Sequence, residues 1–183
     1  MTAFNRSLVL CDVENLSAVP PPIGTRSDYQ CGLRLLSELV EVRPVDHVVV
    51  ASHPNERGVF AARSVFPGCL VKVGHGPDGA DRLLLEHLQD SDWVADRFAR
   101  VIIGSGDGVF TDSVAALATR GTPTVVVSRR NRCSRRLSAC AAEVVFLPEP
   151  IDVPDTLRRG PQSSRLAEDH GRCCALDGNR RAA

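Results

Sequence analysis

The sequence predicts an α/β protein in which a central parallel β-sheet lies between two layers of helices. Short apolar runs alternate along the chain with stretches in which apolar residues recur at helical spacing, as expected for repeated strand–helix units. The runs are continuous Val, Ile and Leu, which indicates strands buried on both faces. Because crossovers between parallel strands are right-handed, these units give a three-layer α/β/α fold.

Each strand is expected at an apolar run, and each helix at a stretch of helical spacing between two runs. The expected strands are Ser7 to Val13, Asp46 to Ser52, Cys69 to Val73, Arg100 to Gly104, Thr124 to Ser128 and Val144 to Leu147. The expected helices are Asp28 to Val42, Glu56 to Ser64, Asp81 to Leu88, Gly108 to Thr119 and Ser134 to Ala142. The first helix has Leu33, Leu36 and Leu39 on one face. The segment around Trp93 is expected to be a connection.

Length and composition indicate one folded domain followed by a tail. The chain has 183 residues, of which 43% are hydrophobic, enough to fill the core of one domain. After Pro148 the apolar periodicity stops, and Pro, Arg, Ser, Gly and Asp dominate. We therefore expect a domain over residues 1–149 and a disordered tail over 150–183. With 22 basic and 22 acidic residues, the chain has no overall nucleic-acid signature, so any such site is local.

The N-terminus and the cysteines favour a cytoplasmic protein without a membrane segment. The first apolar run is short and ends at an acidic residue, unlike a signal peptide, and no run approaches the roughly 20 apolar residues of a membrane span. None of the 7 cysteines is spaced as Cys-x-x-Cys, so no tetrahedral zinc pattern is present. Reduced cysteines in the cytoplasm are the expectation.

Three aspartates follow strands of the predicted sheet or open the helix after one. Asp12 ends the first run, Asp107 follows the fourth, and Asp81 opens a helix after the third. The carboxyl ends of parallel strands meet at one edge of the sheet, where ligands bind. Carboxylates converging there repel one another unless a cation neutralises them, and hard oxygen ligands suit Mg²⁺ or Mn²⁺. The pattern therefore points to phosphodiester chemistry.

Nearby polar residues extend this candidate site. Asn15 lies three residues after Asp12, Ser105 can hold a water or a phosphate oxygen, and Asp112 follows Asp107 within about a helical turn. Each acid also has a structural interpretation. Asp12 and Asp107 suit turns or helix caps, and Asp81 and Asp112 suit the first turn of a helix, where acids complement the dipole.

Arginines follow the fifth strand at the same expected edge. Arg129, Arg130 and Arg132 could hold the phosphates that flank a cleaved bond, because guanidinium groups match phosphate geometry. A solvated loop is the alternative interpretation.

Three motifs in this order resemble the NYN family of the PIN-like nuclease superfamily, including its LabA-like branch. They are Asp-x-x-Asn at Asp12 and Asn15, Gly-x-Asp at Gly79 and Asp81, and Ser-Gly-Asp at Ser105 to Asp107, with Phe110 three residues later. The resemblance spans Ser7 to Leu147 and implies a Rossmann-like (PIN-like) three-layer fold and a metal-dependent ribonuclease. The chain departs from the family at Val109, where an acid is common, and at Asp78, where a Lys is common.

The expected function is therefore an endoribonuclease that depends on Mg²⁺ or Mn²⁺. Asp12, Asp81, Asp107 and Asp112 would bind the metal, Asn15 would orient a ligand or water, and Ser105 and the three arginines would contact RNA. Val109 and Asp78 motivate an alternative, a catalytically inactive NYN-type RNA-binding or regulatory module. A phosphohydrolase or small-nucleotide enzyme is a third class, although the chain has no Walker loop. The RNA target, the number of ions and homo-oligomerisation stay open.

Overall fold

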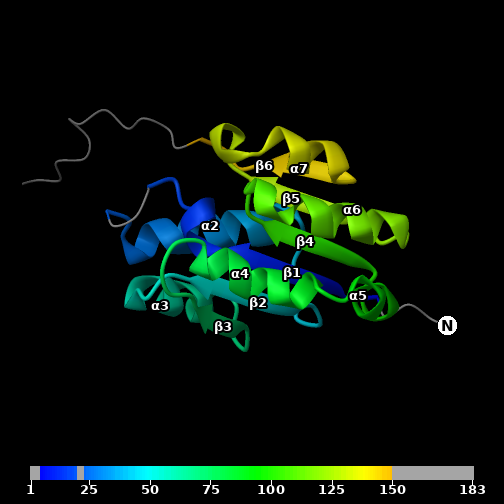
Figure 1. The fold of residues 1–183 in the computed structure, drawn as a ribbon. Coiled ribbons are helices and arrows are strands. Elements are labelled where there is room, and N and C mark those ends of the chain that lie inside the picture. Colours follow the sequence, from blue (N-terminus) through cyan, green and yellow to red (C-terminus); the bar gives the residue numbers. More distant parts are fainter. Residues whose placement is uncertain (1–4, 20–22, 150–183) are drawn as a thin grey trace, which may run out of the picture. The chain divides into compact units, whose positions relative to one another are not determined.

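The central feature of the computed structural model is a six-stranded, fully parallel sheet with the strand order β3-β2-β1-β4-β5-β6 (Figure 1). The structure describes residues 5–19 and 23–149, so the tail expected at 150–183 lies outside the described residues. The strands are β1 (Ser7–Asp12), β2 (His47–Ser52), β3 (Leu70–Val73), β4 (Arg100–Gly104), β5 (Thr124–Ser128) and β6 (Glu143–Phe146). The predicted parallel sheet is confirmed.

Helices cover both faces of this sheet, as the three-layer prediction requires. One face packs against α1 (Val13–Leu16), α2 (Arg26–Leu39) and α3 (Glu56–Val65). The other face packs against α4 (Gly79–Leu85), α5 (Ser91–Arg97), α6 (Thr111–Thr119) and α7 (Arg135–Cys140). Short 3₁₀ turns are η1 (Glu86–Leu88), η2 (Gly108–Phe110) and η3 (Arg130–Arg132). Among the described residues, no helix is long and apolar enough to cross a membrane.

The central strand β1 shows why continuous apolar runs predicted a two-sided sheet. Leu8 and Leu10 pack into the core under α4 to α7, whereas Val9 and Cys11 pack into the core under α1 to α3. All residues of β1 are buried. Since successive side chains of a strand point to opposite faces, a strand covered on both sides must be apolar at almost every position.

The structure adds two helices that the sequence pattern did not predict. The segment around Trp93, expected to be a connection, forms α5. Asp90 caps this helix by accepting a hydrogen bond from the Trp93 N–H at 2.8 Å, and Val94 and Phe98 anchor it in the core. The other is α1, which is four residues long. Both helices are too short to display a clear apolar period.

The strand order places a topological switch point beside β1. The chain passes from β1 outward to β2 and β3 on one side, and then returns to β4 on the other side of β1. At such a switch point the loops after the two strands diverge, and ligands of open α/β sheets bind outside the carboxyl ends of the strands. Asp12 ends β1, and Ser105 to Asp107 follow β4, so the predicted acidic motifs lie at this switch point.

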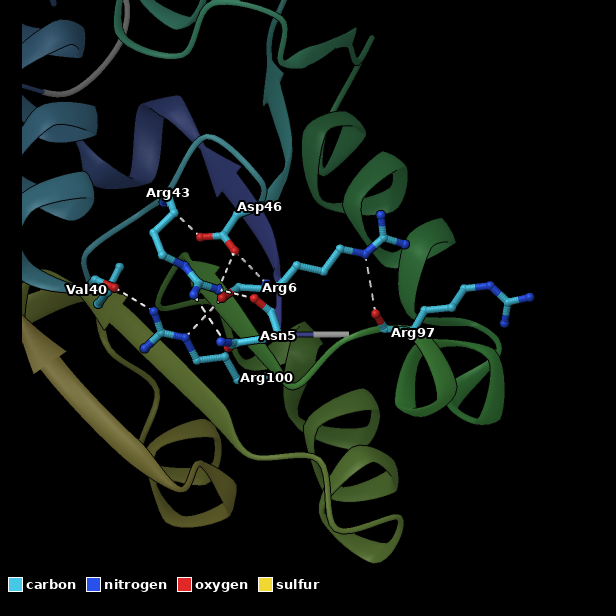
Figure 2. Close-up of polar contacts among 8 residues, drawn as sticks. Asn5, Arg6, Val40, Arg43, Asp46, Arg97 and Arg100 are labelled. Carbon is cyan, nitrogen blue, oxygen red and sulfur yellow. Dashed lines mark hydrogen bonds and ion pairs between the residues drawn. The ribbon is translucent and has the colours of Figure 1, made fainter. Parts of the chain in front are cut away.

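The opposite, amino-terminal edge of the sheet is held by a buried carboxylate (Figure 2). Asp46 accepts hydrogen bonds from the Ser7 N–H at 2.7 Å and from the Arg43 N–H at 2.8 Å, and forms an ion pair with Arg43. Arg100 donates to the Val40 carbonyl at 2.7 Å and to the Ser7 hydroxyl. Burial opposes ionisation of Asp46, but the hydrogen bonds outweigh it and lower its pKa. This network ties β1 and β4 to the loop before β2.

We expect Asp46→Asn to reduce the free energy of unfolding by about 2–3 kcal/mol, because buried donors lose their charged acceptor. Urea unfolding measures the change. The pKa of Asp46 is lower in the folded state than in the unfolded state. The stabilisation that the Asp46 carboxylate provides is therefore complete above the unfolded-state pKa, and it is lost as the pH falls through the folded-state pKa. Asp92→Asn, which breaks an exposed ion pair with Arg120, is the control and changes stability by less than about 1 kcal/mol. Equal effects of the two variants would contradict this role.

Candidate acidic site at the switch point

Four acidic residues lie together at the carboxyl edge of the sheet, and we call Asp12, Glu14, Asp81 and Asp107 the acid cluster. Asp12 ends β1, Glu14 lies in α1, Asp81 lies in the first turn of α4, and Asp107 follows β4. Their charges act on one another. Glu14 and Asp81 raise the pKa of Asp12, and Asp107 and Glu14 raise the pKa of Asp81. Asp12, Asp81 and Asp107 therefore lie at the same edge of the sheet, as predicted, whereas their roles as site residues stay a prediction.

Asp12 is both a helix cap and a member of the cluster. Its Oδ1 accepts hydrogen bonds from the N–H groups of Glu14 at 3.0 Å and Asn15 at 3.2 Å, which starts α1 directly after the strand. The side chain is buried. Burial raises the pKa of Asp12 well above its usual range, the negative charges of Glu14 and Asp81 raise it further, and the hydrogen bond from Asn15 acts in the opposite direction.

Glu14 is the member that sequence reasoning missed. It is 8% exposed, and its Oε1 accepts hydrogen bonds from the Ser52 hydroxyl at 2.9 Å and the His53 N–H at 3.1 Å at the end of β2. Its Oε2 is buried without a hydrogen-bond partner. The only signal in the sequence was its place between Asp12 and Asn15, and a four-residue helix has too little periodicity to predict which way Glu14 points.

Asp81 has one buried carboxylate oxygen, Oδ1, that accepts no hydrogen bond. It is 8% exposed, and its Oδ1 is buried without a partner. Burial and the charges of Asp107 and Asp78 raise its pKa to about 6, although His53 opposes the shift. No side chain caps the start of α4, so Asp81 does not act as a cap. A carboxylate that is buried, unpaired and surrounded by other acids is more easily explained by a ligand than by helix stability.

A close contact between two glycines positions α4. Gly74 follows β3 and Gly79 starts α4, and a Cβ on Gly74 would lie 2.2 Å from the backbone carbon of Gly79. Side chains at this point would push the helix away from the sheet. The glycine pair therefore allows the backbone approach that brings Asp81 over the ends of β1 and β2.

Asp107 is the exposed member of the acid cluster. Its Oδ1 accepts a hydrogen bond from the Val109 N–H at 3.0 Å, so its predicted role as a cap is also present. Ser105 is fully buried, and its hydroxyl accepts a hydrogen bond from the Asp107 N–H at 3.3 Å. Asn15 accepts a hydrogen bond from the Gly106 N–H at 3.2 Å, which joins α1 to this loop. Ser105 and Asn15 thus shape the loop, and direct contact with a substrate or water stays a prediction.

Asp112 stands apart from the other predicted acids. It is exposed in the first turn of α6, and its charge is not among the main influences on the pKa of Asp12 or Asp81 in the described part of the chain. Val109, at the position where the family often has an acid, is 45% exposed. Glu14, rather than Asp112, is therefore the fourth acid beside Asp12 and Asp81.

Two of the three predicted substrate-binding arginines bind the protein's own backbone. Arg129 is buried and donates to the Pro148 carbonyl at 3.1 Å. Arg132 donates to the carbonyls of Glu14 and Ser17, both at 3.1 Å, and so holds the end of α1. Arg130 is exposed and lies 4.4 Å from the centre of the Phe146 ring. Of the three, Arg130 has the guanidinium most available to a phosphate, because Arg129 is buried and Arg132 donates to carbonyls of α1 and Ser17.

The donor set of the acid cluster fits a divalent metal ion in its chemistry. Carboxylate oxygens are the ligands that Mg²⁺ and Mn²⁺ prefer, and two buried carboxylate oxygens, one on Glu14 and one on Asp81, lack a hydrogen-bond partner. Within residues 5–19 and 23–149, no three His, Cys, Asp or Glu side chains already stand in the arrangement of a metal site. The acids are thus neighbours whose side chains would have to move to share one ion.

Comparisons with known proteins support the fold. No protein-family model matches the chain, and no curated protein matches it either. Among solved structures, a protein of unknown function from Vibrio parahaemolyticus RIMD 2210633 is similar, with a TM-score of 0.55 and 20% identity. The match covers 81% of this chain and 96% of that one. At this identity the likeness shows the fold alone.

We expect Asp81→Asn to stabilise the metal-free protein at neutral pH, since the folded state disfavours the charged carboxylate. In the folded state the Asp81 carboxyl keeps its proton up to about pH 6, whereas in the unfolded state it loses the proton at about pH 4. The destabilisation caused by Asp81 therefore grows as the pH rises from about 4 through 6. At about pH 7.5 the variant should melt about 2–4 °C higher, for a gain of about 1 kcal/mol. Thermal melts at several pH values measure this, and a gain that is independent of pH would contradict the cause.

We expect Arg132→Ala to destabilise the protein by about 1–2 kcal/mol, because the carbonyls at the end of α1 lose their donor. Arg130→Ala is the matched control in the same turn and should change stability by less than about 0.5 kcal/mol. Urea unfolding of the two variants separates the structural arginine from the exposed one. A larger loss in Arg130→Ala would show that the assignments are reversed.

Proposed function

We propose that this protein is a metal-dependent endoribonuclease of the NYN type. The observation that carries the proposal is the acid cluster at the switch point of a parallel sheet, in which Glu14 and Asp81 each have a buried oxygen without a hydrogen-bond partner. Buried carboxylate oxygens without a hydrogen-bond partner destabilise a protein, and a functional site is a common reason for keeping them. The order and context of the Asp-x-x-Asn, Gly-x-Asp and Ser-Gly-Asp motifs favour RNA as the substrate class.

In this proposal Asp12, Glu14, Asp81 and Asp107 hold Mg²⁺ or Mn²⁺. When bound, such an ion lowers the pKa of a coordinated water and neutralises charge that develops on the phosphoryl group. Burial is the main cause of the raised pKa of Asp12 and of Asp81, and the negative charges of the neighbouring acids, which would also attract a cation, raise both further.

The chain's own groups then orient the acids and the substrate. The hydrogen bonds from Ser52 and His53 fix one oxygen of Glu14 and leave the other without a protein partner. Asn15, through Gly106, fixes the loop that carries Asp107. Because Asp107 is the exposed acid, it faces the side from which a phosphodiester approaches. Arg130 is exposed after β5 and is available to a flanking phosphate.

Cleavage of an end-labelled RNA of mixed sequence, with Mn²⁺, Mg²⁺ or EDTA, tests the proposal. We expect metal-dependent fragments from the wild type and none from Asp107→Asn, which keeps an oxygen that can cap the Val109 N–H. Asp112→Asn removes an acid outside the cluster and should retain most of the activity. Metal-dependent cleavage by Asp107→Asn equal to that of the wild type would refute the metal mechanism.

Metal binding has a second readout that does not require activity. Mn²⁺ should raise the melting temperature of the wild type, because ligands that bind only the folded state stabilise it. Glu14→Gln and Asp81→Asn should each lose most of that increase. An undiminished Mn²⁺ response in both variants would mean that the ion binds elsewhere.

A catalytically inactive RNA-binding module is the second candidate. It is favoured by Val109, an exposed apolar residue where the family often has an acid. In the same experiment this candidate gives an RNA gel shift without fragments under any metal condition.

A further inference from the structure

An exposed aromatic residue lies beside an arginine on the surface formed by α2 and α3, and we call Phe60, Arg26 and the nearby Arg57 the Phe60 platform. Phe60 is 53% exposed. The guanidinium carbon of Arg26 lies 5.5 Å from the centre of the Phe60 ring. Arg57 precedes Phe60 by three residues on α3, so the two side chains are neighbours on the helix surface. All three residues are exposed.

Packing of α3 does not require this phenylalanine. The helix is buried through Gly58, Ala61 and Ala62, which allow it to lie close to the sheet and to α2. Helix α2 lies beside α3, and the Gln30 side chain of α2 donates a hydrogen bond to the Ser64 hydroxyl of α3 at 2.6 Å. Arg57 of α3 donates to the Gly24 carbonyl, before α2, at 3.2 Å. The helices lie side by side in Figure 1. Phe60 is thus a large apolar ring that the core does not use and that lies under the guanidinium group of Arg26.

The platform is connected to the acid cluster through the start of α3. The His53 N–H donates to Glu14, and two residues later Asn55 caps α3. Phe60 is five residues after Asn55, which corresponds to about 7–8 Å along the helix axis. Gly58 lies so close to Ser52, the other donor to Glu14, that a Cβ would come within 2.3 Å of its hydroxyl oxygen. The two features are therefore held at a fixed spacing on one rigid scaffold.

We propose that the Phe60 platform stacks an unpaired base of single-stranded RNA on the outer surface of α3, upstream or downstream of the nucleotide at the acid cluster, with Arg26 and Arg57 against the adjoining phosphates. The inference rests on the proposed function and specifies its substrate as single-stranded. Aromatic rings bind bases of any sequence through their faces, and arginines nearby add charge and stacking. Bases inside a duplex are already stacked on one another, so a duplex cannot use the ring in this way.

A second arginine–aromatic pair provides an internal control. Trp93 is 43% exposed, and the Arg97 guanidinium carbon lies 4.6 Å from the centre of its ring. This pair belongs to α5, which leads into the amino end of β4, at the edge of the sheet away from the acid cluster. The two pairs have similar chemistry and exposure but differ in position. Position, not aromatic exposure as such, is what the proposal requires.

The test is the binding of a fluorescently labelled, unstructured oligouridine to the full chain by anisotropy, with Ca²⁺ replacing Mg²⁺ and RNA integrity checked on a gel. We expect Phe60→Ala to bind about 10-fold more weakly, Phe60→Trp to restore binding, and Trp93→Ala to match the wild type. Arg57→Ala should reduce the salt dependence of binding, with a change in log–log slope of about 0.7. A blunt-ended RNA duplex, which has no unpaired base, should compete poorly.

The outcomes separate this proposal from the nuclease itself. Unchanged oligouridine binding by Phe60→Ala, in a protein whose wild type cuts RNA, overturns the platform and leaves the nuclease standing. Weaker binding by Phe60→Ala, in a protein that never cuts RNA, supports the platform and overturns the nuclease. Absence of RNA binding by the wild type overturns both. Equal losses in Phe60→Ala and Trp93→Ala also overturn the platform, because they would reflect a general effect of removing aromatic residues.

Discussion

The parallel pairing of β1 with β2 on one side and β4 on the other is the constraint on which the rest of the structure depends. It buries β1 on both faces, which requires an apolar strand, and it leaves Asp12 as the strand's acidic terminal residue. It also brings the ends of β2 and β4 beside Asp12, because parallel strands all end at the same edge. Every later feature of the acidic site follows from this edge. The hydrogen bonds of Asp46 and Arg100 fasten the opposite edge and hold the three strands in register.

The acid cluster is a balance between packing and charge. Helix α1 is only four residues long, yet Asp12 caps its start, Arg132 binds the carbonyls at its end, and Asn15 joins it to the loop after β4. These contacts hold Glu14 in a buried position that its charge disfavours. The close contact between Gly74 and Gly79 brings α4 near the sheet and holds Asp81 in a buried position as well. The fold thus stabilises an arrangement of carboxylates that repel one another, which is the arrangement a cation would favour.

Arginines have different roles in different places, and position in the fold rather than residue type separates those roles. Arg129 and Arg132 lie in the basic segment that the sequence singled out, but both donate hydrogen bonds to backbone carbonyls of the protein itself. Arg26 and Arg57 lie in no basic run, yet both are exposed, and Arg26 lies over an exposed aromatic ring. A charge run along a sequence is therefore a weak guide to a binding surface, because burial decides which charges are free to meet a ligand.

The sequence by itself determined the three-layer fold, most strand positions and the convergence of Asp12, Asp81 and Asp107. These follow from local apolar patterns and from the rule that parallel strands end at one edge. Only the tertiary structure decided the place of Glu14, the separation of Asp112, the backbone contacts of Arg129 and Arg132, and helix α5. Each of these depends on contacts between residues far apart in the chain, such as Glu14 with Ser52 or Arg132 with Ser17. Periodicity tells which face of an element is buried, but the direction of a single polar side chain depends on the partners that folding brings to it.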